Sequence, residues 1–150
     1  MPVQDEVFGF FIPSVTLMGV GSRKEIGEQI KLLGSRKPLI CTDREMVAAG
    51  ISSQVVTQIQ KMCGVNAIVY EDPKPGPMNI SVEEGLGLYQ RHQCDLILSL
   101  GGTSAHDCGK GIGIVATNGG NLRDYSAVDQ SLEAMPTFIP FMIRPLASKP

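Results

Sequence analysis

In the segment ILSLGGTSAHDCGKGIGIVATNGG, an apolar strand runs straight into two glycines and then into a helix. Asp95–Leu100 reads DLILSL, and an apolar run without alternation is typical of a parallel strand that is covered on both faces. Gly101–Ser104 follow at once, and the residues after them predict a helix that ends at Gly119-Gly120. This order restricts the chain to folds in which a buried strand is followed by a glycine turn and then by the N-terminus of a helix.

The turn Gly101–Ser104 has two explanations that the residues alone leave equally open. Between a strand and a helix, free backbone N–H groups and the positive end of the helix dipole face outward. Two glycines would let a ligand approach the backbone, and Ser104 could act as the helix N-cap and donate its hydroxyl to a phosphate oxygen. The turn fits a pyrophosphate-binding loop, and it fits a tight strand-to-helix connection equally well.

The remaining segments alternate between strand and helix signals. Strands are predicted at Pro38–Thr42 and Val65–Tyr70, and Val7–Ile12 and Val15–Met18 read as a β-ribbon. Two further helices are predicted to begin at capping boxes, Ser22 with Glu25 and Ser81 with Glu84. Two more are predicted to begin at single N-caps, one at Asp43 and one at Ser52 or Ser53. The pattern indicates an α/β fold: a Rossmann-like layered domain with a mainly parallel sheet and an N-terminal β-ribbon.

Composition narrows the function classes. With 150 residues, of which 43% are hydrophobic, the chain is expected to form a single domain. A net charge of −2 with scattered basic residues argues against nucleic acid. No apolar run reaches the roughly 18 residues of a membrane helix, and the first residues do not resemble a signal peptide, so we expect no membrane association and a cytoplasmic location. The four widely spaced cysteines predict reduced, mostly buried thiols.

Named phosphate motifs are incomplete in this chain. A Walker A loop needs G-x-x-x-x-G-K-[ST], but Ser104 stands at its first glycine position and Gly111 follows Lys110. The dinucleotide fingerprint G-x-G-x-x-G also fails, because Lys24 and Gln90 occupy the third glycine position of its two nearest matches. Glycines inside the helix after the turn would weaken it, so close packing against a neighbour is predicted there, at Gly109, Gly111 and Gly113.

Three polar side chains are further candidates for a site. In a parallel sheet, ligands lie outside the carboxyl ends of the strands, and Asp43 directly follows the strand PLICT. Its carboxylate could accept the hydroxyls of an adenosine ribose, or cap the helix that follows, and the two roles can coexist. His106 and Asp107, in the first turn after the glycines, could line a pocket. The chain has two histidines in all, and two histidines without further partners make a poor metal site, so we assign no metal site.

Taken together, these segments resemble the iron-containing (group III) alcohol dehydrogenases. FFIPSVTLMGVGS, PLICTD, the proline loop, CDLILSLGGTSAHDCGKGIGIVATNGG, LRDY and MPTFIPFM match the N-terminal, cofactor-binding half of that family in order and spacing, over about residues 7–142. The family includes propanediol dehydrogenase, lactaldehyde reductase and some methanol dehydrogenases. The resemblance implies an oxidoreductase that transfers a hydride between a small primary alcohol or diol and NAD.

The resemblance also implies roles for individual residues. The family's G-G-G-S loop, which holds the NAD pyrophosphate, corresponds to Gly101, Gly102, Thr103 and Ser104, with Thr103 in place of the third glycine. The family aspartate that selects NAD through the adenosine ribose matches Asp43. Asp107 matches the aspartate of the family's S-x-x-D turn, and His106 the variable residue before it. The family's P-N-P-T loop looks like residues 75–78 here, PGPM, which lack its asparagine and threonine.

The departures from the family lie toward the end of the chain. Residues 143–150, IRPLASKP, diverge from the family's T-T-x-G-T-x-S-E segment, and the helical half that binds iron or another divalent metal through one aspartate and three histidines is not represented. We therefore expect residues 1–150 to form one NAD-binding domain without catalytic or metal-ligating residues, and the resemblance implies a homo-oligomer, as is common in the family.

Three interpretations of this chain stay open at this point. The first is an NAD-dependent alcohol dehydrogenase by family, with little turnover from these residues alone. The second is a truncated module that binds NAD without chemistry. The third is a truncated product without a selected function.

Overall fold

Four parallel strands form the centre of the molecule. The structure, a computed structural model, describes residues 21–72, 78–125 and 135–142. Within these ranges the strands lie in the order β2-β1-β3-β4, and every pairing is parallel. Their bounds are β1 Pro38–Asp43, β2 Ile68–Asp72, β3 Leu96–Gly101 and β4 Thr137–Met142. The predicted parallel α/β sheet is confirmed, whereas the predicted N-terminal ribbon falls outside the described residues.

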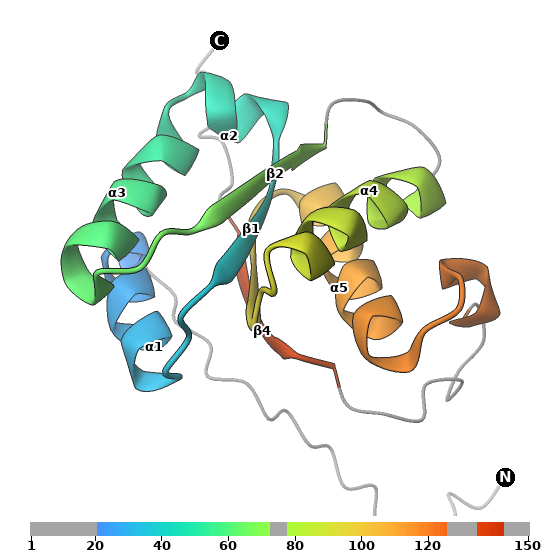
Figure 1. The fold of residues 1–150 in the computed structure, drawn as a ribbon. Coiled ribbons are helices and arrows are strands. Elements are labelled where there is room, and N and C mark those ends of the chain that lie inside the picture. Colours follow the sequence, from blue (N-terminus) through green and yellow to red (C-terminus); the bar gives the residue numbers. More distant parts are fainter. Residues whose placement is uncertain (1–20, 73–77, 126–134, 143–150) are drawn as a thin grey trace, which may run out of the picture.

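Helices cover both faces of this sheet and complete a three-layer fold (Figure 1). One layer contains α1 and α3, and the opposite layer contains α4 and α5. The helices are α1 Ile26–Leu32, α2 Arg44–Ala48, α3 Ile51–Cys63, α4 Met78–Arg91 and α5 Thr103–Asn118, with 3₁₀ turns at Ser22–Glu25 and Leu122–Tyr125. None of the helices in the described ranges is long and apolar enough to cross a membrane.

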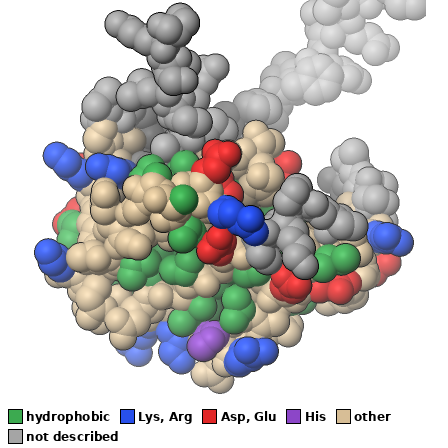
Figure 2. Space-filling model, turned by 90° about the horizontal axis from the view of Figure 1, so that it is seen from above, with side chains coloured by type: hydrophobic (Ala, Val, Ile, Leu, Met, Phe, Trp, Pro, Cys, Tyr) green, Lys and Arg blue, Asp and Glu red, His purple; other side chains and the backbone are tan. Residues whose placement is uncertain are grey.

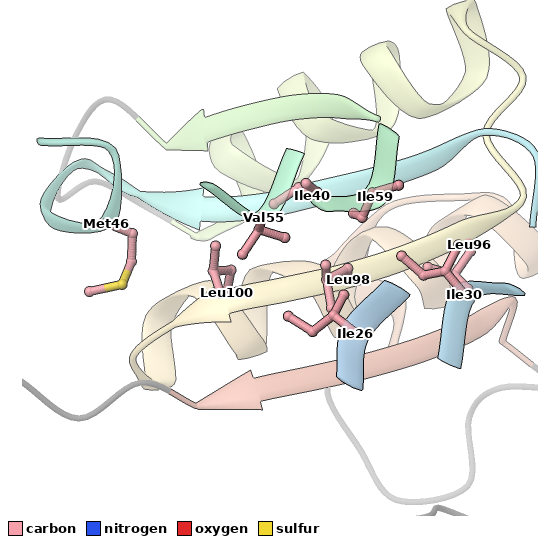
Figure 3. Packing of buried hydrophobic residues seen from close by; sticks show 9 residues of the cluster. All are labelled: Ile26, Ile30, Ile40, Met46, Val55, Ile59, Leu96, Leu98 and Leu100. Carbon is pink, nitrogen blue, oxygen red and sulfur yellow. The ribbon is translucent and has the colours of Figure 1, made fainter. Parts of the chain in front are cut away.

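The core is divided between the two faces by the alternation of strand side chains. Leu96, Leu98 and Leu100 of β3 point toward α1 and α3, and Figure 3 shows them beside Ile26 and Ile30 of α1. The intervening residue Ile97 points to the other face, where it packs in the cluster that contains residues of α4 and α5. Because β3 is buried on both faces, its continuous apolar run is explained as predicted.

Glycines let α5 lie unusually close to its neighbours. A Cβ on Gly109 would stand 2.9 Å from Phe138 Cε2 of β4, and one on Gly111 would stand 2.7 Å from Val82 Cγ2 of α4. Both distances are shorter than real Cβ contacts, so the absence of a side chain is what permits the packing. The predicted close approach at these positions is confirmed.

Three of the predicted helix starts are wrong, and at two of them a left-handed glycine is the N-cap instead of the serine. Gly21 and Gly50 adopt left-handed φ values of 86° and 72°, and these turns start the helical segments before any serine can cap them. Ser52 consequently lies buried inside α3, and Ser22 lies in a 3₁₀ turn. Ser81 lies inside α4, which begins at Met78. The strand predicted from Val65 begins later, at Ile68.

Candidate functional site

The two strongest site predictions, Asp43 and the glycine turn, meet at the carboxyl ends of adjacent strands. Asp43 ends β1 and Gly101 ends β3, and the paired residues just before them are Thr42 and Leu100. Figure 2 views the molecule from the side on which β1 leads into α2, where carboxylate and basic side chains are interspersed with hydrophobic ones. The parallel pairing therefore brings together residues that are 58 positions apart or more.

The Asp43 carboxylate connects the two strand ends. Its Oδ1 accepts a hydrogen bond from the Met46 amide at 2.9 Å, which is the N-cap bond of α2. Its Oδ2 accepts from the Gly102 amide at 3.3 Å. The predicted helix cap is therefore confirmed, and the same side chain also contacts the glycine turn.

The adjacent glycines differ in what their backbone requires. Gly101 has a φ of +138°, and a Cβ placed on it would collide with Asp43 Oδ2. Gly102 has an extended backbone, with φ −88° and ψ −169°, and a Cβ there would meet none of the described residues within 4 Å. The fold requires glycine at Gly101, whereas no described residue fills the space beside Gly102.

The N-terminus of α5 presents free amides next to this space. Gly102 is the N-cap, so the prediction that Ser104 caps the helix is wrong; Ser104 is the second helical residue. The first bond of the helix runs from the His106 amide to the Gly102 carbonyl at 3.2 Å, and the amides of residues 103–105 precede it without an intrahelical acceptor. Thr103 and Ser104 are both exposed. Thr103 does not have a positive φ, so a threonine at the position of the family's third glycine causes no backbone strain.

His106 and Asp107 of α5 differ in their exposure to solvent. Asp107 is exposed, but His106 is only 5% exposed, and its Nδ1 lies 2.5 Å from the Ser99 hydroxyl of β3. Its Nε2 is buried and has no hydrogen-bond partner in the described part of the chain. Burial, with a smaller contribution from Lys110, lowers the pKa of His106, which favours the neutral imidazole.

Two polar residues near the site were not predicted from the sequence. Thr42 is fully buried and donates its hydroxyl to the Leu100 carbonyl at 2.8 Å, which joins the ends of β1 and β3 just before the site. Ser99 supports His106 from β3. The available signal was a hydroxyl residue within each of the apolar strands PLICT and LILSL, because a buried hydroxyl requires a partner.

The other segments singled out in the sequence lie largely outside the described ranges. Most of the proline loop and the tail 143–150 fall outside. Among the residues that the structure describes, no group of three or more His, Cys, Asp or Glu side chains could hold a metal ion. The described residues therefore provide no set of ligands for iron.

Comparison with known proteins identifies the family. Residues 13–147 match the sequence profile described as iron-containing alcohol dehydrogenase. Over 120 residues, 80% of this chain, the sequence is 38% identical to NAD-dependent methanol dehydrogenase of Bacillus methanolicus. It is 33% identical over 135 residues to 1,3-propanediol dehydrogenase of Citrobacter freundii.

Solved structures agree with these sequence matches. A crystal structure of 1,3-propanediol oxidoreductase superimposes with a TM-score of 0.84 and 31% identity, covering 91% of this chain and 36% of that one. The chain spans about a third of the length of the relatives it matches, 31% of the methanol dehydrogenase and 35% of the propanediol dehydrogenase. With most of its length matched by the family profile, the chain belongs to the iron-containing alcohol dehydrogenase family.

Proposed function

We propose that these residues bind NAD as the cofactor-binding part of an alcohol dehydrogenase that acts on a small primary alcohol or diol. When bound, NAD supplies the hydride acceptor, or as NADH the donor, for such a reaction. The observation that carries the proposal is the space beside Gly102, which no described residue fills, at the start of a 16-residue helix and next to Asp43. The name of the methanol dehydrogenase relative, which states NAD dependence, supports the same cofactor.

The turn would hold the pyrophosphate of NAD. Amides of residues 103–105 lack intrahelical acceptors, and the dipole of α5 is positive at this end. The exposed hydroxyls of Thr103 and Ser104 add donors for phosphate oxygens. Gly101 shapes the turn, and Gly102 leaves the approach clear.

Asp43 would accept the hydroxyls of the adenosine ribose. A carboxylate has about four acceptor positions, and the Met46 and Gly102 amides occupy two of them. The remaining lone pairs can receive ribose hydroxyls, while a 2′-phosphate would be repelled by the negative charge. We therefore propose a preference for NAD over NADP.

His106 and Asp107 would contribute from different positions. His106 would support the turn from beneath, because its nearly buried imidazole is held by Ser99. Asp107 is exposed one helical turn after Thr103, on the surface near the turn. We assign no residue of this chain to the metal that the family name implies. A cytoplasmic location and a homo-oligomeric state are part of the proposal and follow the expectations from the sequence.

The first test is a calorimetric titration of the 150-residue chain with NAD and, separately, with NADP. Saturable binding that favours NAD would support the proposed site. A folded chain that binds neither nucleotide would contradict it. Metal-dependent alcohol oxidation by the same sample would distinguish a complete enzyme from a module that only binds the cofactor.

Gly102→Val is the variant that tests the turn itself. The Cβ of the valine would meet none of the described residues within 4 Å, so we expect the fold to be retained while phosphate approach is blocked. We expect NAD affinity to fall at least tenfold, because this factor corresponds to the loss of about one hydrogen bond to a charged group. Unchanged affinity in a folded Gly102→Val protein would show that the turn does not hold the cofactor.

A further inference from the structure

We infer that Asp43 is also a positioning residue for the glycine turn, which it holds in a form ready to receive pyrophosphate. The inference rests on the proposed function and assigns to Asp43 a task separate from recognition of the ribose. Asp43 would act on the phosphate group through the backbone, by way of the bond from the Gly102 amide to Oδ2.

The hydrogen bonds divide the amides of the turn between two tasks. The Gly102 amide points to Asp43, whereas the amides of residues 103–105 have no intrahelical acceptor. An amide directed at a carboxylate is not available to a phosphate. The Asp43 bond therefore fixes one peptide plane, and the following amides are left free in a set orientation.

Such a restraint is needed because sterics alone do not fix this turn. Two consecutive glycines allow a wide range of backbone angles, and Gly101 has an unusual φ of +138°. Asp43 Oδ2 occupies the position that a Gly101 side chain would take, so the carboxylate packs directly against this glycine. The carboxylate is itself held by the Met46 amide at 2.9 Å and is therefore a firm anchor.

Two other accounts of Asp43 predict different effects on pyrophosphate. If Asp43 recognised only the ribose, a ligand without ribose would not respond to its replacement. If its charge merely repelled phosphate, removal of the charge would strengthen binding. The positioning role predicts weaker binding of pyrophosphate when the carboxylate becomes an amide, which is the opposite of the effect expected from charge repulsion.

The test compares Asp43→Asn with the unaltered chain, using inorganic pyrophosphate as the ligand. Asparagine is a good N-cap, so its oxygen can keep the Met46 bond, but its NH₂ group would then face the Gly102 amide with no acceptor between them. We expect pyrophosphate affinity to fall about tenfold, and exchange of the Gly102 amide in the unliganded protein, followed by NMR, to accelerate by a similar factor.

Glu71→Gln is the matched control for charge. Glu71 is paired in register with Thr42 at the same sheet edge, and its side chain lies 3.9 Å from Arg44 rather than on the turn. Its replacement removes the same unit charge without touching Gly102. We expect pyrophosphate affinity and Gly102 exchange to stay unchanged.

Asp43→Ser provides a second variant if the asparagine protein is unstable. Serine also caps helices well, but its single hydroxyl cannot serve the Met46 and Gly102 amides together. Weaker pyrophosphate binding and faster Gly102 exchange in either folded variant support the positioning role. Equal or tighter binding, or unchanged exchange, would overturn it while leaving NAD binding by the parent chain intact. If the parent chain binds neither NAD nor pyrophosphate, the proposed function fails and the positioning role with it.

Discussion

At the turn between β3 and α5, Gly101 has a φ of +138°, whereas its neighbour Gly102 has a φ of −88°. The first value lies where side chains are strained, and the second is accessible to any residue. The Asp43 carboxylate fills the space beside Gly101, but no atom of the residues that the structure describes fills the space beside Gly102. One glycine therefore serves the fold, and the other is free for the role in NAD binding that we propose.

Alanine substitutions should separate these two glycines in stability. Gly101→Ala would place a strained residue against Asp43, and we expect the free energy of unfolding to fall by about 1–3 kcal/mol. Gly102→Ala adds a methyl group to open space and should change it by less than about 0.5 kcal/mol. Chemical denaturation of both variants measures the difference. Equal destabilisation would mean that the turn differs in solution from this arrangement.

At this site, the residues that take part could be predicted from the sequence better than the contacts between them. The position of Asp43 after an apolar strand indicated both a helix cap and a site residue, and the cap is confirmed. Its bond to Gly102 could not be predicted, because it joins residues 59 positions apart and depends on strand pairing. Likewise, nothing local in the sequence showed that His106 faces inward onto Ser99.

Helices α4 and α5 pack against each other through glycine on both sides. A Cβ on Gly85 of α4 would collide with Ile112 Cδ1 of α5 and stand 3.0 Å from the ring of Tyr70 on β2. On the other helix, Gly111 lies against Val82 of α4. These contacts hold α5 near the sheet, and with it the amides at its N-terminus.

Two glycines of α4 provide a controlled test of this packing. Gly85→Ala should lower the free energy of unfolding by about 1–3 kcal/mol, because the methyl group overpacks the contact with Ile112. Gly87→Ala faces no atom within 4 Å and should raise it by up to about 1 kcal/mol through helix propensity. Thermal unfolding of both proteins measures this contrast. A gain for both variants would show that α4 and α5 are not closely packed at Gly85.

Elements were predicted more reliably than their ends. The apolar runs PLICT and DLILSL gave the two central strands, since burial on both faces leaves a strong signal. Helix starts were missed where a left-handed glycine, such as Gly50, placed the first turn ahead of a serine that could have capped it. Capping residues indicate that a helix begins nearby, but the competition between a glycine turn and a serine cap is decided by the packing of the whole helix.

Across the whole molecule, the two ends of β3 are secured by titratable groups of different kinds. At its start, Asp95 accepts hydrogen bonds from the Ser35 hydroxyl at 2.6 Å and from the Arg36 and Lys37 amides at 2.8 and 3.1 Å. Near its end, Ser99 holds the buried imidazole of His106. One group must be ionised and the other neutral for the folded state to be most stable.

These groups predict two separate losses of stability as the pH falls. Burial lowers the pKa of His106 below its usual 6.5, so the unfolded chain binds this proton more readily, and stability declines as the pH drops below about 6.5. For Asp95, burial acts to raise the pKa, but the hydrogen bonds from Ser35, Arg36 and Lys37 outweigh it and lower the pKa below 3.8, so its contribution is lost only in stronger acid. Unfolding midpoints measured from pH 8 to pH 3 should show both declines.

Single variants assign each decline to its group. His106→Gln should abolish the decline that begins near neutral pH, and Asp95→Asn should abolish the one in stronger acid, although each variant will also be less stable at pH 7 because a native hydrogen bond is lost. His92→Gln, which replaces an exposed imidazole, is the control and should retain both declines. If the first decline survives in His106→Gln, the imidazole is not buried in its neutral form, and the support that we assign to it beneath the glycine turn would be wrong.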